Sequence, residues 1–278
     1  MAGQLSVTIE GFASDLAATY TQIYGEWHPE CSATITRCSR LVLAHISACE
    51  MPYHNVEHTM LVTTAGQQIL IGKHRSEGSV TPEDWQRFTV ALLCHDIGYV
   101  RGVCRGDANG RFATGEGDDT VTLPEGSTDA ALTPYHVSRS RLFVRENYDA
   151  LGVEARDVEA ITADIEMTRF PPPRTPADQS AGTYGGLVRA ADFIGQFGDP
   201  NYLRKLPALF VEFEQVGANE AMGYRTPDDM RATYATFFRD VVEPHLQDAL
   251  RYLRVTPEGE RWIASLQSHL REVERGDA

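Results

Sequence analysis

Apolar side chains recur at spacings of three and four residues through most of the sequence, and this spacing constrains the fold more than any other feature. A helix turns once in about 3.6 residues, so the pattern gathers the apolar residues on one helical face. Strands would instead need strict alternation between turns, and such runs are hard to find here. We therefore predict an all-α fold built as a multi-helix bundle.

The same spacing gives the positions of the predicted helices, and two of these helices begin with recognisable caps. Thr81-Pro82-Glu83-Asp84 and Thr256-Pro257-Glu258 each place a hydroxyl residue before a proline and acids, as helix starts do. The predicted helices cover residues 12–24, 31–49, 54–74, 82–96, 129–147, 154–163, 182–197, 201–216, 227–254 and 257–273.

Two segments interrupt the helical pattern. Residues 101–128 are rich in Gly, Asp and Thr and are too long for a simple connection, so we interpret them as a lid. Residues 170–186 are rich in proline and predict a rim loop or a rigid spacer. Neither segment is long enough to separate domains, and we find no repeats. We expect a single domain over residues 1–278, with a core at about 50–200 and C-terminal helices at about 201–273.

The charge of the chain excludes one class of partner. The sequence has 25 Lys and Arg residues against 39 Asp and Glu residues, which gives a net charge of −14. Such a surface repels polyanions, so we expect no nucleic-acid polymer as a partner. A small phosphate ester is compatible with this charge, because bound metal ions can supply positive charge locally.

Composition also bears on where the protein works. No segment has the roughly 20 apolar residues of a membrane span, and the first residues lack the basic and apolar regions of a signal peptide. We expect a cytoplasmic protein that binds no membrane. The five cysteines form no CxxC pair, which predicts reduced thiols, with Cys94 in the core. The sequence leaves homo-oligomerisation open.

Metal-ligand residue types occur in three predicted helices. In MPYHNVEHTM, His54 and His58 are four apart, so a helix would place both on one face. In ALLCHDIGYVRG, His95 and Asp96 end an apolar helix. In LVRAADFIGQF, Asp192 is a lone acid in an apolar run, where an unpaired carboxylate is strongly disfavoured.

Each of these features has an ordinary structural interpretation when it stands alone. His54 and His58 could be packed or capping histidines, the His–Asp pair could be a hydrogen-bonded helix end, and Asp192 could pair with Arg189. Their combination in compatible helices favours a metal site instead. Nitrogen and oxygen ligands together suit zinc, manganese, iron or, at the oxygen-rich end, magnesium.

These motifs resemble the HD superfamily, and within it the catalytic domain of the class I cyclic nucleotide phosphodiesterases. YHNVEH resembles the family's YHNxxH, LCHDIG its HD motif, and TADIEMT its ATDMxxH segment. RAADFIG, PALFVEFEQVGANEAMG and FFRDVVEPHL resemble three later segments, in the same order. The resemblance extends over about residues 50–250 and implies an HD-domain, phosphodiesterase-like helical bundle.

The resemblance also implies roles for the candidate residues. His58, His95, Asp96 and Asp192 would bind a first divalent metal, and Asp96 would also reach a second. His54 would be the general acid that protonates the leaving ester oxygen, while a hydroxide bridging the two metals attacks phosphorus. The implied cofactors are therefore two divalent ions, from among Mn, Mg, Zn and Fe.

Three further residues have two interpretations each. His136 lies where HD proteins often place a histidine that bears on the second metal or its waters, and it could equally be a satisfied core histidine. Asp164 could lie behind the metal's water ligands or form a structural salt bridge. Asn55 could orient a neighbouring helix or loop, or simply start a helix.

The sequence departs from the phosphodiesterase pattern at positions that bear on the substrate. Tyr99 replaces a histidine, and Arg101 could substitute for it by contacting a phosphate. Tyr234 stands at the position of the glutamine that reads purines, whereas Phe237 keeps the aromatic residue that would clamp a base. Thr168 replaces the final histidine of the ATDMxxH segment.

The sequence therefore predicts a metal-dependent phosphohydrolase acting on a small phosphate ester, with a nucleotide or a cyclic nucleotide as the substrate class. Two other classes are compatible with the same ligands. One is an HD-type di-iron oxygenase, which cleaves C–C or C–P bonds with O₂. The other is a non-catalytic, metal-stabilised sensor domain.

Overall fold

The computed structural model describes residues 2–172 and 182–276, and this part of the chain is all-α apart from one short two-stranded sheet, as the apolar spacing predicts. The helices are α1 (Ala2–Tyr24), α2 (Pro29–Ile46), α3 (Val56–Glu77), α4 (Pro82–Cys94), α5 (His136–Leu151), α6 (Val158–Glu166), α7 (Tyr184–Phe197), α8 (Tyr202–Glu214), α9 (Ala218–Met222), α10 (Pro227–Phe237), α11 (Gln247–Leu253) and α12 (Pro257–Arg275).

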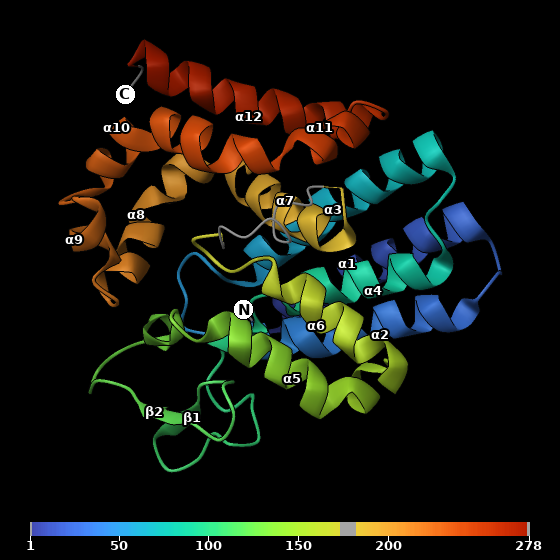
Figure 1. The fold of residues 1–278 in the computed structure, drawn as a ribbon, viewed down its shortest axis with the longest axis horizontal. Helices are drawn as coiled ribbons and strands as arrows, with labels where there is room; N and C mark the ends of the chain where they lie inside the picture. Colours follow the sequence, from blue (N-terminus) through green and yellow to red (C-terminus); the bar gives the residue numbers. More distant parts are fainter. Residues whose placement is uncertain (1, 173–181, 277–278) are drawn as a thin grey trace.

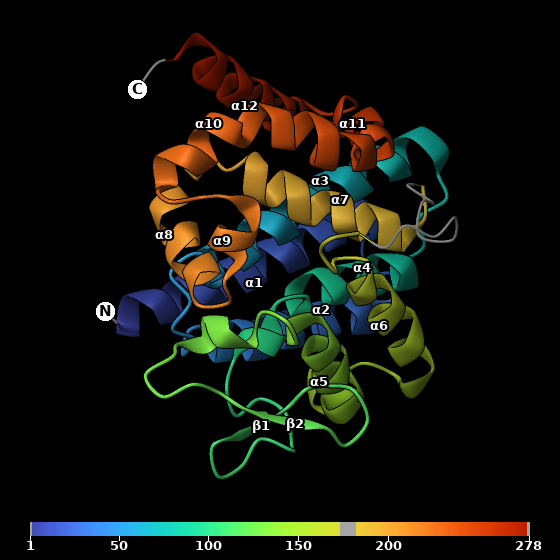
Figure 2. The same ribbon diagram turned by 60° about the vertical axis from the view of Figure 1, so that its left-hand side comes forward.

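Helix α3 runs through the centre of the bundle. Its most extensive contact is with α7, and it also packs against α4, α11 and α12. In both ribbon views α12 lies along one edge of the molecule, over α11, and the β hairpin lies at the opposite edge beside α5 (Figures 1 and 2). The interior between these edges is where α3, α4 and α7 bring their inward-facing side chains together.

The close approach of α3 and α7 depends on Gly195. A Cβ atom added there would lie 2.5 Å from Cα and 2.7 Å from the backbone nitrogen of Val62 on α3. Backbone atoms cannot move aside as a flexible side chain can, so only glycine allows this helix spacing. The spacing matters for the site, because Asp192 lies one turn before Gly195 and His58 one turn before Val62.

Local capping fixes where the site-bearing helices begin and end. The side chain of Asn55 accepts hydrogen bonds from the backbone N–H groups of Glu57 and His58, so it is the N-cap of α3. Thr81 is the N-cap of α4, as the sequence predicts, and it also forms a capping box with Asp84. Helix α4 ends at Cys94 and is followed by a 3₁₀ turn over Ile97–Tyr99.

The structure corrects several predicted boundaries. Helix α1 begins at Ala2, ten residues before the predicted start. The predicted helix 227–254 is broken after α10 by a π-helical turn over Phe238–Val242 and a 3₁₀ turn over Glu243–His245. Pro244 explains this break, because proline lacks an N–H group and its ring clashes with the preceding helical turn.

The segments between helices also differ from the prediction. Residues 101–128 contain an antiparallel hairpin of β1 (Arg111–Ala113) and β2 (Thr120–Thr122), which the search for alternating runs missed because each strand is only three residues long. The predicted helix 129–147 begins as a 3₁₀ turn over Asp129–Leu132, ahead of α5. Part of the predicted rim loop at 170–186, residues 173–181, lies outside the described residues.

Two predictions from composition concern residues within the described part of the chain. All five cysteines are free thiols, and Cys94 is fully buried, as predicted. None of the described helices combines the length and the apolarity that crossing a membrane would require.

We predict that Gly195→Ala lowers the free energy of unfolding by about 1–3 kcal/mol, because the added methyl group would collide with the α3 backbone. Gly11→Ala is the matched control, since a Cβ at this position in α1 meets nothing within 4 Å. Alanine should stabilise the helix by about 0.5–1 kcal/mol at this exposed position. Urea denaturation of both variants measures the difference, and equal stabilities would contradict the packing argument.

Candidate metal centre

Four predicted ligands converge from three helices. His58 lies in the first turn of α3, His95 and Asp96 directly follow α4, and Asp192 lies in the middle of α7. The Nε2 atom of His95 is 3.1 Å from Oδ2 of Asp96, and Nε2 of His58 is 3.3 Å from the same oxygen. Both Nε2 atoms are 3.6 Å from Oδ1 of Asp192. His58, His95 and Asp96 are buried, and Asp192 is 20% exposed.

The hydrogen bonds of the cluster leave its inward-facing atoms free. Nδ1 of His95 is 2.7 Å from the carbonyl oxygen of Leu92 and donates to it, so in the neutral ring Nε2 carries the lone pair. Among the described residues, Nε2 of His58, Nε2 of His95 and Oδ2 of Asp96 are buried without a hydrogen-bond partner. Buried polar atoms without partners are costly, and a metal ion satisfies all three at once.

The electrostatics of the cluster also favour a cation. Burial would raise the pKa of Asp96, but His95 and His58 hold that pKa well below its usual range. Burial would likewise raise the pKa of Asp192, yet the two histidines lower it to about 2. Burial would lower the pKa of His95, but Asp96 and Asp192 raise that pKa well above its ordinary value. The site therefore has a negative potential that a proton or a divalent cation can neutralise.

These buried His and Asp groups could hold a metal ion. One ligand atom from each of His58, His95 and Asp192 lies within 4.8 Å of the other two, and the same is true of His54, His58 and Asp96. The mixture of imidazole and carboxylate donors is that expected from the sequence.

His54 is close to this cluster, but not for the reason that the sequence suggested. It precedes α3 instead of sharing a helical face with His58, and the two ring centroids are 5.1 Å apart. Its Nδ1 atom is 2.5 Å from Oε2 of Glu212, whose other oxygen accepts from the backbone N–H groups of Tyr53 and His54. Burial would lower the pKa of His54, but Glu212 raises it to about 9.

Sequence reasoning missed Glu212. It is 2% exposed and lies on α8, which carries no metal-ligand candidate. A signal was present, because PALFVEFEQ surrounds this acid with apolar residues just as LVRAADFIGQF surrounds Asp192. The run predicts a buried carboxylate that needs a partner, but not which partner.

His136 also faces the cluster. It is the first residue of α5, and its Nδ1 atom donates to the carbonyl oxygen of Thr133 at 2.6 Å. Its Nε2 atom is 4.0 Å from Oδ1 of Asp96, the carboxylate oxygen that faces away from His58 and His95. His136 therefore borders the cluster on the side of Oδ1 of Asp96.

Tyr99 lies between two of these histidines. Its ring stacks on His136 with centroids 4.3 Å apart and an interplanar angle of 7°, and on His54 at 5.2 Å and 29°. The ring is 4% exposed, so this tyrosine is part of the wall of the centre.

The side chains of two other predicted residues, Asn55 and Arg101, bind groups outside the cluster. Asn55 is the N-cap of α3, the simpler of its two interpretations. Arg101 forms an ion pair with Asp129, Nε to Oδ1 at 3.0 Å, and donates to the carbonyl oxygen of Ser127 at 2.6 Å. The guanidinium is therefore held by the segment that follows the hairpin.

Asp164 is not brought to the metal residues, contrary to one interpretation of the sequence. A Cβ added at Gly185 would lie 3.1 Å from Oδ1 of Asp164, and Gly185 is about two helical turns, or about 10 Å, before Asp192 on α7. Asp164 lines a separate pocket of about 420 Å³ with Asp84 and Arg87. Burial raises its pKa to about 7.

Tyr234 and Phe237 belong to an aromatic cluster around the end of α7. Tyr234 is 3% exposed and packs against Phe197 and Tyr202, and its hydroxyl has no hydrogen-bond partner within the described part of the chain. Phe237 is half-buried, with its ring stacked on Phe197 at 6.1 Å and tilted against Phe170 at 6.0 Å.

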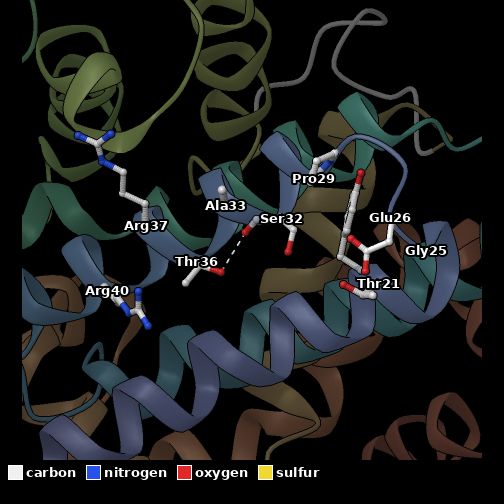
Figure 3. A pocket seen from close by; sticks show the side chains of 10 residues that line it. Thr21, Gly25, Glu26, Pro29, Ser32, Ala33, Thr36, Arg37 and Arg40 are labelled. Carbon is white, nitrogen blue, oxygen red and sulfur yellow. Dashed lines mark hydrogen bonds between the residues drawn. The ribbon is translucent and has the colours of Figure 1, made fainter.

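A surface crevice of about 410 Å³ lies between α1 and α2 (Figure 3). Its lining includes Thr21, Ser32, Thr36 and Arg40, and Thr36 donates to the backbone carbonyl oxygen of Ser32. None of the metal-ligand candidates lines this crevice, and Arg40 is already paired with Glu10.

One family model, described as Npun_R2479-like, matches residues 3–276 of the chain. No curated protein gives a significant match. The family description names neither a reaction nor a ligand, so the function has to be argued from the site itself.

We predict that Asp96→Asn greatly weakens the retention of divalent metal, because it removes a buried charge that lies against two imidazole nitrogens. Asp164→Asn is the matched control, a carboxylate on a different part of the bundle that should leave metal content unchanged. Elemental analysis of the two purified variants beside the parent protein measures this, and full metal content in Asp96→Asn would contradict the assignment.

Proposed function

The chain belongs to the Npun_R2479-like family, and we propose that it is a metal-dependent phosphohydrolase of the HD type that hydrolyses a small phosphate ester. The observation that supports this most directly is the buried set of free ligand atoms on His58, His95 and Asp96, faced by Asp192. The placement of His54 and Glu212 beside that set supplies a proton donor, which a purely structural metal site would not need.

His58, His95, Asp96 and Asp192 would hold the first divalent ion, and Asp96 with His136 would reach a second. The donor set suits Mn, Mg, Zn or Fe. Bound ions of this kind supply Lewis acidity, which neutralises the charge of a phosphate and makes a water molecule a stronger nucleophile. Asp96 would have the central position, because its Oδ2 atom lies beside His58 and His95 and its Oδ1 atom is 4.0 Å from Nε2 of His136.

His54 would act as the general acid. Its Nδ1–H group is held by Glu212, which fixes the ring and stabilises the protonated form. The proton on Nε2 would pass to the leaving ester oxygen as the P–O bond breaks. The backbone N–H groups of Tyr53 and His54 donate to the other oxygen of Glu212, and these two bonds fix the orientation of the carboxylate.

A phosphate ester suits the charge of the site. Because Arg101 is paired with Asp129, the positive charge that a phosphate requires would come from the ions and from His54. With a net charge of −14, the protein would favour a small ester over a polymer.

A nucleotide, or a cyclic nucleotide in the narrowest version, is the substrate class that we propose. Phe237 is half-buried and could stack on a base. The phenol of Tyr234 cannot present the paired donor and acceptor of an amide, so purine selectivity should differ from that of the phosphodiesterases.

We predict that His54→Asn lowers turnover by about 10²–10⁴ while metal content stays nearly normal, because it removes the proton donor but no proposed metal ligand. His45→Asn, at an exposed histidine on α2, is the control and should leave both quantities unchanged. Because His54 also belongs to a possible ligand group, loss of metal from His54→Asn would assign it to metal binding instead.

We predict that the purified protein contains about two divalent ions per chain and releases phosphate or a monoester from at least one ester in a screen. The screen covers cyclic nucleotides, nucleotides and an aryl phosphodiester, each with added Mn, Mg, Zn or Fe. Tightly bound iron with O₂ consumption would favour an oxygenase, and bound metal without any turnover would favour a sensor domain. Either outcome would refute the phosphohydrolase proposal.

A further inference from the structure

Arg139 is a fully buried charge close to the centre, and none of the roles proposed above uses it. It lies on α5 three residues after His136, and its exposure is 0%. An arginine in the interior is costly unless each of its five N–H donors finds an acceptor. Here the guanidinium makes five hydrogen bonds, and their acceptors indicate what it holds together.

Two of these bonds reach the turn that follows Asp96. Nε donates to the carbonyl oxygen of Gly98 at 2.6 Å, and one terminal nitrogen donates to that of Val100 at 2.9 Å. Both acceptors lie within four residues of Asp96, in or just after the 3₁₀ turn. Arg139 therefore fixes the backbone that carries the proposed bridging carboxylate.

The other three bonds reach the segment 101–128. The guanidinium binds both oxygens of Asp107, at 3.0 and 2.9 Å, and donates to the carbonyl oxygen of Ala113 in β1 at 2.6 Å. Asp107 also accepts from the backbone N–H groups of Gly102 and Ala113 at 2.8 and 2.9 Å. The base of this segment is thus tied to α5 by a buried ion pair.

The neighbouring residue completes the attachment. The hydroxyl of Ser140 donates to the carbonyl oxygen of His95 at 2.7 Å and accepts from the N–H group of Gly98 at 2.9 Å. A Cβ atom at Gly98 would lie 1.9 Å from the carbonyl oxygen of His136, so α5 packs directly against this backbone. The turn bearing His95 and Asp96 and the helix bearing His136 form one rigid unit.

We propose that Arg139 is a positioning residue of the metal centre, which holds Asp96 at a fixed distance from His136 and anchors the base of segment 101–128 beside them. This proposal rests on the proposed metal-dependent function. It implies that the base of the segment is fixed to α5, so that any movement of the segment is confined to the hairpin tip. Asp107 is the counter-ion whose negative charge offsets the cost of burying the guanidinium in that position.

The test uses cobalt(II), whose visible absorption reports the geometry of its ligands, on the full-length chain. Arg139→Lys keeps the charge but cannot reach five acceptors from one ammonium group. Asp107→Asn replaces an acceptor by an amide that faces N–H donors, and Ser140→Ala removes only the link between His95 and Gly98. Arg145→Lys is the matched control, on the same helix but in a surface pair with Glu159.

We expect Arg139→Lys and Asp107→Asn to bind cobalt(II) about ten- to a hundredfold more weakly, with a shifted visible spectrum, since losing residues that orient ligands has effects of this size. Ser140→Ala should change both quantities in the same direction but less. Arg145→Lys should match the parent. Thermal melts of the same samples show whether each variant is folded.

Folded Arg139→Lys and Asp107→Asn variants with the cobalt affinity and spectrum of the control would overturn the proposal. If Arg139→Lys fails to fold, normal cobalt binding by Asp107→Asn and Ser140→Ala would equally overturn it, because the role of the arginine would be stability alone. The cobalt measurements require no turnover. If the parent protein binds cobalt but hydrolyses no ester, only the proposed function is refuted. If it binds no cobalt, both the proposed function and the role of Arg139 are refuted.

Discussion

The site depends on the close contact of two carboxylates with two imidazole nitrogens inside the bundle. Asp96 and Asp192 lie 3.1–3.6 Å from Nε2 of His58 and His95, and three of these side chains are buried. Taking such groups out of water costs several kcal/mol for each charge, and contacts among the four do not satisfy every atom. A bound cation would give these unsatisfied atoms a partner. The arrangement therefore favours metal binding over a structural salt bridge.

The helices meet closely enough for this because small residues stand where backbones touch. Gly195 lets α7 approach α3, and Gly98 lets the turn after Asp96 approach α5. Each ligand also lies at or near the end of its helix or beside such a contact, so its position is set by backbone geometry more than by side-chain flexibility. A cluster built in this way is held in place by the packing of the helices themselves.

Much of this site could be predicted from sequence, and the limits have a physical cause. Asp192 and the His95–Asp96 pair were found because a polar residue in an apolar run is anomalous within a short window. Glu212 carries the same signal, but its partner His54 is 158 residues away, and no local pattern encodes that pairing. The helical face assumed for His54 failed for a local reason, since Asn55 caps α3 after it. Asp164 kept two interpretations because an apolar context indicates burial but not location, and the structure places it in a pocket with Asp84 and Arg87.

Tyr99 stands where the phosphodiesterase pattern has a histidine, and its surroundings show what this difference changes in the cluster. A histidine at this position would add a titratable ring between His54 and His136, and its positive charge, when protonated, would act on Asp96. Burial raises the pKa of Tyr99 well above its ordinary value, so the ring stays neutral while it stacks on both histidines. Glu212 holds Nδ1 of His54, and the carbonyl oxygen of Thr133 accepts from Nδ1 of His136. The tyrosine therefore packs against both imidazoles without adding charge to the cluster, so replacing a histidine here leaves the donor set of His58, His95, Asp96 and Asp192 unchanged.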